Sequence, residues 1–255
     1  MDVTYLPSSA GSAGPLAFLS SYVVNDRVAI DAGSLGFWHD VPAQLRVEHV
    51  FISHSHLDHL ASLAAFLENI FMGQGKTPTV YGSSHVIECL RRDYFNNRVW
   101  PDLLSLRDVT PTPLHVVEIE PGEPVEVGDL RVTPIAVDHV VPTTAFLVEE
   151  PGAAVVFSAD TGPTTSLWEH ANRCDQLRGV FIDSAFPNAE QAFADLSQHL
   201  TPATVAQELT KLDRKDVRCL AVHLKPAYLE QIIADLNELT DPRIEVGEPG
   251  VTYSF

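Results

Sequence analysis

The sequence predicts a mixed α/β fold in one domain, with two β-sheets and outer helices. Short apolar runs dominate the N-terminal half, a meander of short strands runs from about residue 113 to residue 158, and strands then alternate with helical segments. Such a pattern favours sheets covered by helices. The 255 residues, 45% of them hydrophobic, can bury one large core and would be cramped as two domains. We therefore expect a single domain over residues 1–255.

Short runs rich in Val, Ile or Phe and bounded by turn signals are typical of strands. They occupy residues 21–24, 27–31, 49–53, 79–82, 131–137, 145–148, 153–158, 179–183 and 219–223. Helical periodicity appears at 57–71, 84–95, 201–212 and 225–239. Thr201 before Pro202 indicates a helix N-cap followed by a first-turn proline.

The composition argues against several partners and locations. The chain has 34 acidic and 16 basic residues and a formal net charge of −18, and such a surface repels nucleic-acid phosphates. No apolar stretch approaches the roughly 18 residues of a membrane span, and the N-terminus lacks the features of a signal peptide. Cys89, Cys174 and Cys219 form no CxxC pair, which indicates reduced thiols. We expect a cytoplasmic protein without nucleic-acid or membrane partners.

Residues 54–60 read HSHLDHL and place three histidines and an aspartate within six positions. Imidazole and carboxylate groups are the usual ligands of zinc and similar divalent ions. His54 and His56 lie two residues apart and can face one ion. Asp58 and His59 start an apolar helical run and can face a neighbouring ion. The motif therefore predicts two metal ions, each of which needs a further ligand.

Three later residues follow apolar runs, where a scaffold presents functional groups to a cleft. His139 and His223 offer ring nitrogens, and the two oxygens of Asp160 can bridge both ions. A single histidine in such a place is more often structural, and Asp-Thr-Gly at Asp160 is also a common turn. Five other isolated histidines are expected to be structural, namely His39, His49, His85, His115 and His170.

Taken in order, HSHLDH, His139, Asp160 and His223 resemble the motifs of the metallo-β-lactamase superfamily. The resemblance covers nearly the whole chain and implies an α/β (α+β) fold, an αββα sandwich of two mixed sheets with outer helices and a two-metal site. Asp31 matches an aspartate at the end of an early strand that usually supports the ligands. The superfamily includes lactamases, thiolesterases, nucleases and phosphodiesterases.

Finer features resemble the class II cyclic-nucleotide phosphodiesterases. The matching segments are HSHLDHLASL (54–63), DYFNNRVWPDL (93–103), FSADTGP (157–163), VFIDSAFPN (180–188), QHLTP (198–202) and VHLKPAYL (222–229). The chain departs from that family at Ala64 and Ala65, where larger aliphatic residues are usual. It also departs at Asp183-Ser184, where Glu-Cys or Glu-Ser is common, and at Gln198, where Gly is usual. These departures concern the surroundings of the ligands more than the reaction class.

The resemblance implies hydrolysis of 3′,5′-cyclic nucleotides, cAMP or cGMP, to 5′-monophosphates. Two metals roughly 3.5–4 Å apart can hold a bridging hydroxide and clamp phosphoryl oxygens. Asp58 can orient the hydroxide, and His199 can protonate the leaving 3′ oxygen, with Asp183 fixing its tautomer. A plain loop role for His199 is the alternative. Zinc is the expected metal, with manganese or iron as alternatives.

Residues 84–103 are expected beside the cleft. Phe95 and Trp100 can stack on a base, and Asn96 can hydrogen-bond to base or ribose; local core packing is the alternative for the aromatic rings. The densest basic cluster of the chain lies in the same segment and consists of Arg91, Arg92 and Arg98. We interpret it as a solvated helix face rather than a substrate site.

Three alternative functions stay open. A tRNA 3′-endonuclease has similar metal motifs but needs a basic patch, whereas residues 132–172 contain no Lys or Arg. A thiolesterase or lactonase can use the same metal pair to polarise a carbonyl, although FNN, WP and QHLTP favour the phosphodiesterase. A non-catalytic nucleotide sensor is the third. The expected partner is a small cyclic nucleotide, and a homodimer is one open assembly.

Overall fold

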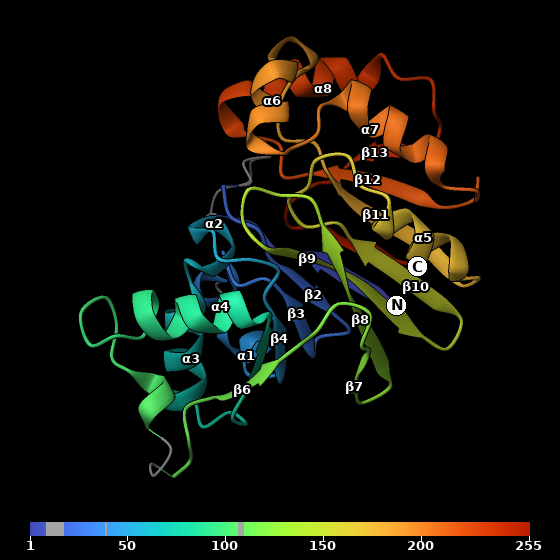
Figure 1. Ribbon diagram of the computed structural model, residues 1–255. Helices are drawn as coiled ribbons and strands as arrows, with labels where there is room; N and C mark the ends of the chain where they lie inside the picture. Colours follow the sequence, from blue (N-terminus) through green and yellow to red (C-terminus); the bar gives the residue numbers. More distant parts are fainter. Residues whose placement is uncertain (9–17, 39, 107–109) are drawn as a thin grey trace. The chain divides into compact units, whose positions relative to one another are not determined.

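The computed structural model describes residues 1–8, 18–38, 40–106 and 110–255 (Figure 1). Two compact units divide the chain. We call Asp2–Glu120 with Pro249–Ser254 the N-terminal unit, and Pro121–Glu248 with Met1 and Phe255 the C-terminal unit. Each unit contains one mixed sheet and its helices, so the prediction of two mixed sheets with helices is confirmed. The single domain over residues 1–255 stays a prediction.

The sheet of the N-terminal unit combines antiparallel and parallel strands. In order across the sheet, they are β14 (Thr252–Ser254), β1 (Asp2–Tyr5), β2 (Tyr22–Val24), β3 (Val28–Ile30), β4 (His49–Phe51), β5 (Thr79–Gly82) and β6 (His115–Glu118). Pairing is antiparallel from β14 to β3 and parallel from β3 to β6. Ile30 pairs with Phe51 at the ends of β3 and β4. Because these strands are parallel, Asp31 and Ser53 follow at the same sheet edge.

The helices of this unit are short. They are α1 (Val41–Gln44), α2 (Leu57–Leu60), α3 (Leu63–Met72) and α4 (Ser84–Cys89), with single turns η1 (Leu35–Phe37), η2 (Leu90–Tyr94) and η3 (Leu103–Ser105). The helix predicted over 57–71 is interrupted at Ser62, whose Oγ donates to the Ala32 carbonyl and accepts from Gly36 N, both at 2.8 Å. Phe66 of α3 packs with Ile52 in the core beneath.

The sheet of the C-terminal unit begins as a meander. In order across the sheet, the strands are β13 (Ile244–Val246), β12 (Arg218–Val222), β11 (Leu177–Asp183), β10 (Ala153–Phe157), β9 (Thr143–Glu150), β8 (Leu130–Val137) and β7 (Val125–Val127). Strands β7 to β10 are antiparallel, and β10 to β13 are parallel, as the change from meander to alternation predicts. Asp183 pairs with Val222, so Asp183 and His223 lie at one edge.

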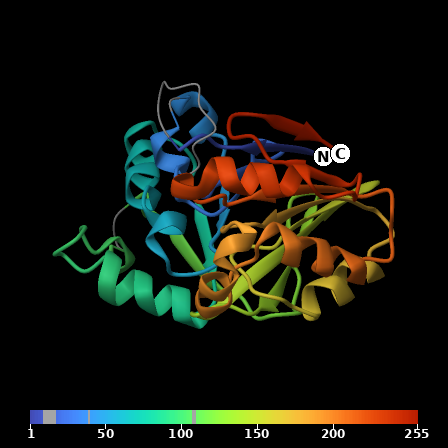
Figure 2. The ribbon, with the colours of Figure 1, turned by 90° about the horizontal axis from the view of Figure 1, so that it is seen from above.

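Helices cover one face of this second sheet. They are α5 (Ser166–Arg173), α6 (Gln191–Ser197), α7 (Pro202–Glu208) and α8 (Leu229–Asn237), with turns η4 (Asn188–Glu190), η5 (Leu209–Lys211) and η6 (Pro226–Tyr228). Figures 1 and 2 show α5, α7 and α8 along the sheet, where Trp168 and Val205 pack on Val180. The predicted cap of α7 is confirmed, because Thr201 Oγ1 accepts from Thr204 N and Thr204 Oγ1 accepts from Thr201 N.

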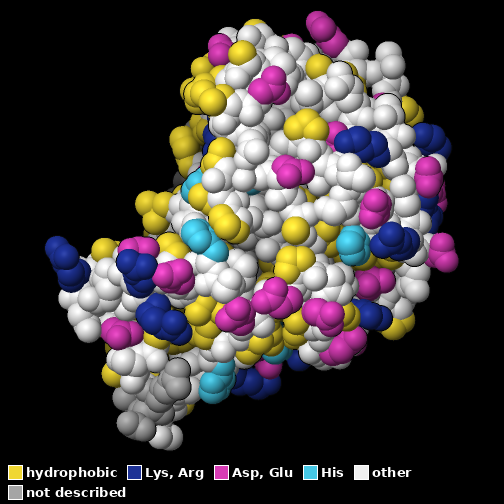
Figure 3. Space-filling view, in the orientation of Figure 1, with side chains coloured by type: hydrophobic (Ala, Val, Ile, Leu, Met, Phe, Trp, Pro, Cys, Tyr) yellow, Lys and Arg dark blue, Asp and Glu magenta, His cyan; other side chains and the backbone are white. Residues whose placement is uncertain are grey.

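Acidic and basic side chains are interspersed over the face drawn in Figure 3, with histidines among them. Within the described ranges, the helices are too short or too polar for any of them to cross a membrane.

Candidate metal centre

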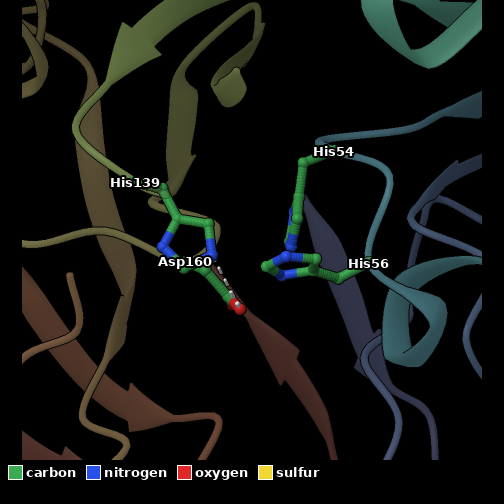
Figure 4. Close-up of side chains that lie close together, drawn as sticks. All are labelled: His54, His56, His139 and Asp160. Atoms are coloured by element: carbon green, nitrogen blue, oxygen red, sulfur yellow. Dashed lines mark ion pairs between the residues drawn. The ribbon is translucent and has the colours of Figure 1, made fainter. Parts of the chain in front are cut away.

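The HSHLDH motif lies in the N-terminal unit on the loop between β4 and α2. His54 and His59 are buried, and the centroids of their rings lie 4.1 Å apart. The rings of His54 and His56 lie 4.7 Å apart at an interplanar angle of 78°. Figure 4 shows these two side chains turned toward each other from the loop. Three imidazoles so close together, two of them buried, form a donor set suited to a divalent cation.

Asp31 fixes this loop from the end of the neighbouring strand. Its Oδ1 accepts a hydrogen bond from Ser53 N at 2.8 Å, and its Oδ2 accepts one from Ser53 Oγ at 2.9 Å. The same Oδ2 lies 2.6 Å from Nδ1 of His59, and Ser53 Oγ lies 2.9 Å from Nδ1 of His54. Because Nδ1 of each ring faces these oxygens, Nε2 is the nitrogen that His54 and His59 would offer to a metal.

A close backbone approach sets the start of α2. A Cβ on Gly33 would lie only 2.0 Å from the carbonyl oxygen of Asp58 and 2.7 Å from Ser20 N, so glycine is required there. Ser20 N donates to that Asp58 oxygen at 2.9 Å, and Ala32 N donates to the His59 oxygen at 2.8 Å. The loop after β3 therefore holds the helical turn that carries Asp58 and His59.

The C-terminal unit gathers the later predicted residues around Asp160, which is 2% exposed. Its Oδ2 lies 3.9 Å from Nε2 of His139, the pair joined by the dashed line in Figure 4, and 4.0 Å from Nε2 of His199. Its Oδ1 lies 3.3 Å from Nδ1 of His223. Nδ1 of His139 lies 3.0 Å from the Gln198 carbonyl oxygen and donates to it in the matching tautomer. Asp160 thus contacts three histidines from different loops.

Asp183, fully buried at the end of β11, connects two of these histidines. Its Oδ2 accepts from Nδ1 of His199 at 2.8 Å and from Leu200 N at 3.3 Å, and its Oδ1 lies 3.2 Å from Nδ1 of His223. Burial raises the pKa of Asp183, but the charges and hydrogen bonds of His199 and His223 together outweigh burial and hold the pKa below its ordinary value. Asp183 is therefore an ionised acceptor that orients both rings.

One donor atom from each of Asp160, Asp183, His199 and His223 lies within 4.8 Å of the others. Two carboxylates and two imidazoles at this spacing are chemically able to bind a divalent cation. The group includes Asp183 and His199, which the sequence assigned to proton transfer rather than to ligation. The two roles make different predictions for metal content when His199 is replaced.

Left-handed backbone conformations occur at the predicted residues Asp31 and His223, and at Ala159 and Gln198, which directly precede Asp160 and His199. Asp31 has φ 61°, Ala159 has φ 53°, Gln198 has φ 53° and His223 has φ 62°. Non-glycine residues rarely adopt this region, and strained backbone tends to collect at functional sites. At Gln198, glycine, the residue that the resemblance implies, would adopt this conformation without strain.

The substrate-binding residues expected at 84–103 belong largely to local structure. Phe95 is 0% exposed in the core of the N-terminal unit and has no face for a base, which corrects that expectation. Asn96 Oδ1 accepts from Arg98 N and Val99 N within its own turn, and Trp100 packs partly buried against the same core. The segment is therefore a packed turn, in agreement with local core packing, the alternative named for these aromatic rings in the sequence analysis.

The isolated histidines that the structure describes have local partners or are exposed. His49 contacts Tyr81 and His85 contacts Ser55, both at 3.1 Å. His115 is exposed at an edge strand, and Nδ1 of His170 lies 2.8 Å from a backbone oxygen of its own helix. His39 lies outside the described residues. Of the basic cluster, Arg92 in η2 is exposed and pairs at 2.8 Å with Glu88, four residues earlier in α4, as expected of a solvated face.

Sequence reasoning missed a cation and an aromatic cluster in the C-terminal unit. Lys225 Nζ lies 3.1 Å from Nε2 of His223. Phe186 lies at the centre of the cluster, with its ring 5.6 Å from His199, 5.0 Å from Phe193 and 6.0 Å from Tyr228, measured between centroids. The quoted segments VFIDSAFPN and VHLKPAYL contain Lys225, Phe186 and Tyr228, but apolar spacing alone did not distinguish them from core residues.

The family model described as the beta-lactamase superfamily domain matches residues 27–224. A Yersinia pestis protein named a probable 3′,5′-cyclic-nucleotide phosphodiesterase is 27% identical over 229 residues, which cover 78% of this chain and 65% of that protein. A Mycobacterium bovis ribonuclease Z is 26% identical over 183 residues, covering 67% of this chain and 62% of that one. The chain thus spans somewhat less than two thirds of the length of these relatives.

Among solved structures, unliganded yeast PDE1 is similar with a TM-score of 0.79. The superposition covers 98% of both chains at 17% sequence identity. Similarity at this sequence identity establishes a shared fold. The chemical reaction has to be inferred from the residues of the site.

Proposed function

Because the chain belongs to the family of β-lactamase superfamily domains, we propose that it is a metal-dependent phosphodiesterase that opens 3′,5′-cyclic nucleotides to nucleoside 5′-monophosphates. One observation carries the proposal: buried histidines and aspartates, oriented by hydrogen bonds, follow the strand ends in both units. The similarity to a Yersinia pestis protein named for this reaction supports the substrate class.

Two divalent ions are proposed as cofactors, with zinc first and manganese or iron as alternatives. The proposed ligands are the motif residues His54, His56, Asp58, His59, His139, Asp160 and His223. The side chains fit this role, because Nδ1 of His54, His59 and His139 each faces an oxygen that orients the ring. When bound, the ions supply positive charge for phosphoryl oxygens and lower the pKa of the attacking water.

The remaining chemistry falls to side chains of the chain itself. His199 is proposed to protonate the leaving 3′ oxygen through Nε2, because its Nδ1 faces the carboxylate of Asp183 at 2.8 Å. The negative charge of Asp183 stabilises the protonated ring from which that proton is given. Asp58, in the first turn of α2, is proposed to orient the attacking water.

The test is to incubate the metal-loaded protein with cAMP and with cGMP, separate the products by chromatography and count bound metals by mass spectrometry. We expect a 5′-monophosphate and about two metals per chain. His199→Ala should keep its metals and lose about 10²–10⁴-fold in kcat, whereas His170→Ala, a histidine on α5, is the matched control. An unchanged kcat in His199→Ala removes the proton-transfer role, and loss of a metal reassigns His199 as a ligand.

A ribonuclease Z-like endonuclease is the second candidate, favoured by the relative from Mycobacterium bovis. The net charge of −18 opposes binding of a tRNA backbone. We expect weak tRNA retention on filters even at low salt, and tight retention would favour the endonuclease. If the metal-loaded protein leaves cyclic nucleotides intact, thioesters and lactones are the next substrates, and nucleotide binding without turnover would indicate a sensor.

A further inference from the structure

The aromatic cluster of the C-terminal unit is separate from the main core of that unit. Ala185, Phe186 and Ala194 form their own small buried group, with Tyr228 packed against it. Such satellite groups usually lie under loops and need no other role. Here, however, the group extends to the surface, because Phe193 on α6 is 49% exposed and Leu196, three residues later, is 76% exposed.

The cluster is continuous with the residue proposed to transfer the proton. Phe186 meets the ring of His199 edge-on at 5.6 Å and 70°, and meets Phe193 at 5.0 Å and 89°. The T-shaped contact with Phe186 holds the Phe193 ring in place while half of its surface stays in solvent. The partly exposed ring of Phe193 is thus linked to His199 through the buried ring of Phe186. A fixed aromatic face of this kind suits a planar, weakly polar group better than it suits water.

A positive charge lies in the segment that carries Tyr228. Lys225 N donates to the Ala185 oxygen at 3.2 Å, and Tyr228 N donates to the Lys225 oxygen at 2.9 Å. Nζ of Lys225 is 3.1 Å from Nε2 of His223. One short segment thus presents a cation next to the proposed metal ligand His223 and an aromatic ring next to Phe186. A cation can pair with the phosphate of a nucleotide, and an aromatic ring can stack on its base.

We propose that Phe193 and Tyr228, both packed on the buried ring of Phe186, form the nucleobase subsite, and that Lys225 faces the phosphate. This inference rests on the proposed function and deepens it, because it assigns base recognition to the C-terminal unit instead of to Phe95, which is buried. Stacking on an aromatic face tolerates any base, so the subsite accepts both adenine and guanine.

The experiment measures product binding, so that turnover is not needed. Adenosine 5′-monophosphate and ribose 5-phosphate are titrated by calorimetry into the metal-loaded protein and its variants. Phe193→Ala should weaken adenosine 5′-monophosphate binding by about 5- to 150-fold, the range of base stacking on an aromatic side chain, and leave ribose 5-phosphate unchanged. Phe193→Tyr should restore binding, and Lys225→Met should weaken both ligands.

The matched control is Phe71→Ala, which removes a phenylalanine of similar exposure, 42%, from the N-terminal unit. Loss of affinity in this control, or equal effects of Phe193→Ala on both ligands, would overturn the subsite. So would a change from dimer to monomer in Phe193→Ala, measured by sedimentation, without an effect on nucleotide binding. Binding through Phe193 without any cAMP hydrolysis by the wild type would remove the proposed reaction and keep the subsite. Hydrolysis of cAMP by the wild type, with an unchanged KM in Phe193→Ala, would keep the proposed reaction and remove the subsite.

Discussion

Replacing Gln198 by glycine is expected to stabilise the protein. Gln198 has φ 53° and ψ 55° at the C-terminal end of α6. In this left-handed region, the Cβ crowds the following carbonyl oxygen, at a cost of about 1–2 kcal/mol. Glycine removes that cost, although its freedom in the unfolded chain offsets about 0.5–1 kcal/mol. The expected net gain in the free energy of unfolding is about 0.5–1 kcal/mol.

Urea and thermal unfolding, followed by circular dichroism, measure this gain. Gln198→Ala removes the same side chain but keeps the strained Cβ, so the glycine variant should exceed it by about 1 kcal/mol, or roughly 2–4 °C in Tm. Gln74, with φ 56° in the N-terminal unit, is the matched control. Gln74→Gly should also stabilise the protein. A Gln198→Gly variant less stable than Gln198→Ala would refute the assignment of strain to this residue.

Three further outcomes are expected. Asp183→Asn should lower kcat by about 10²–10⁴-fold with little change in KM in steady-state assays, because an amide cannot stabilise the protonated ring of His199; a fall confined to KM would contradict this. Hydrogen bonds from Arg243 hold the pKa of Asp241 below its ordinary value. Its stabilisation is therefore complete above the unfolded pKa near 4 and is lost at lower pH, so the Tm difference between wild type and Asp241→Asn should shrink from pH 7 toward pH 3. Zinc at 100 times its Kd should stabilise the metal-free protein by about 2.7 kcal/mol in thermal melts, and His54→Ala should reduce that effect.

The strands to which the sequence analysis assigned residue ranges are mostly interior, and those without an assigned range lie mostly at the sheet edges, although β6 and β7 fall within the predicted meander of residues 113–158. β13, β7, β14 and β6 are the four outermost strands. β6 is mostly exposed and β14 buries only its middle residue, so neither needs the continuous apolar run that marks a buried strand. These edge strands form because their backbones hydrogen-bond to a neighbouring strand. A short stretch of sequence read by itself does not show which strand will be that neighbour.

The candidate site shows a similar division. HSHLDH was visible because its density of imidazoles and carboxylates has few purely structural explanations. Phe95 was misplaced because an aromatic residue in a helical pattern looks the same whether its ring enters a core or faces a ligand. Lys225 and Phe193 were missed because their proximity to His223 and Phe186 arises from loops that converge only in the folded unit.

The carboxylate of Asp183 contacts His199 with one oxygen and His223 with the other. In the proposed enzyme, the proton donor and a metal ligand therefore share a single anionic anchor. A substitution at Asp183 that changes the basicity of the His199 ring also changes the basicity of the His223 ring. The acid strength of the proton donor and the affinity for the metal therefore cannot evolve independently. Mutations around this carboxylate should show strong epistasis, and engineering a new metal preference will require compensating changes at the proton donor.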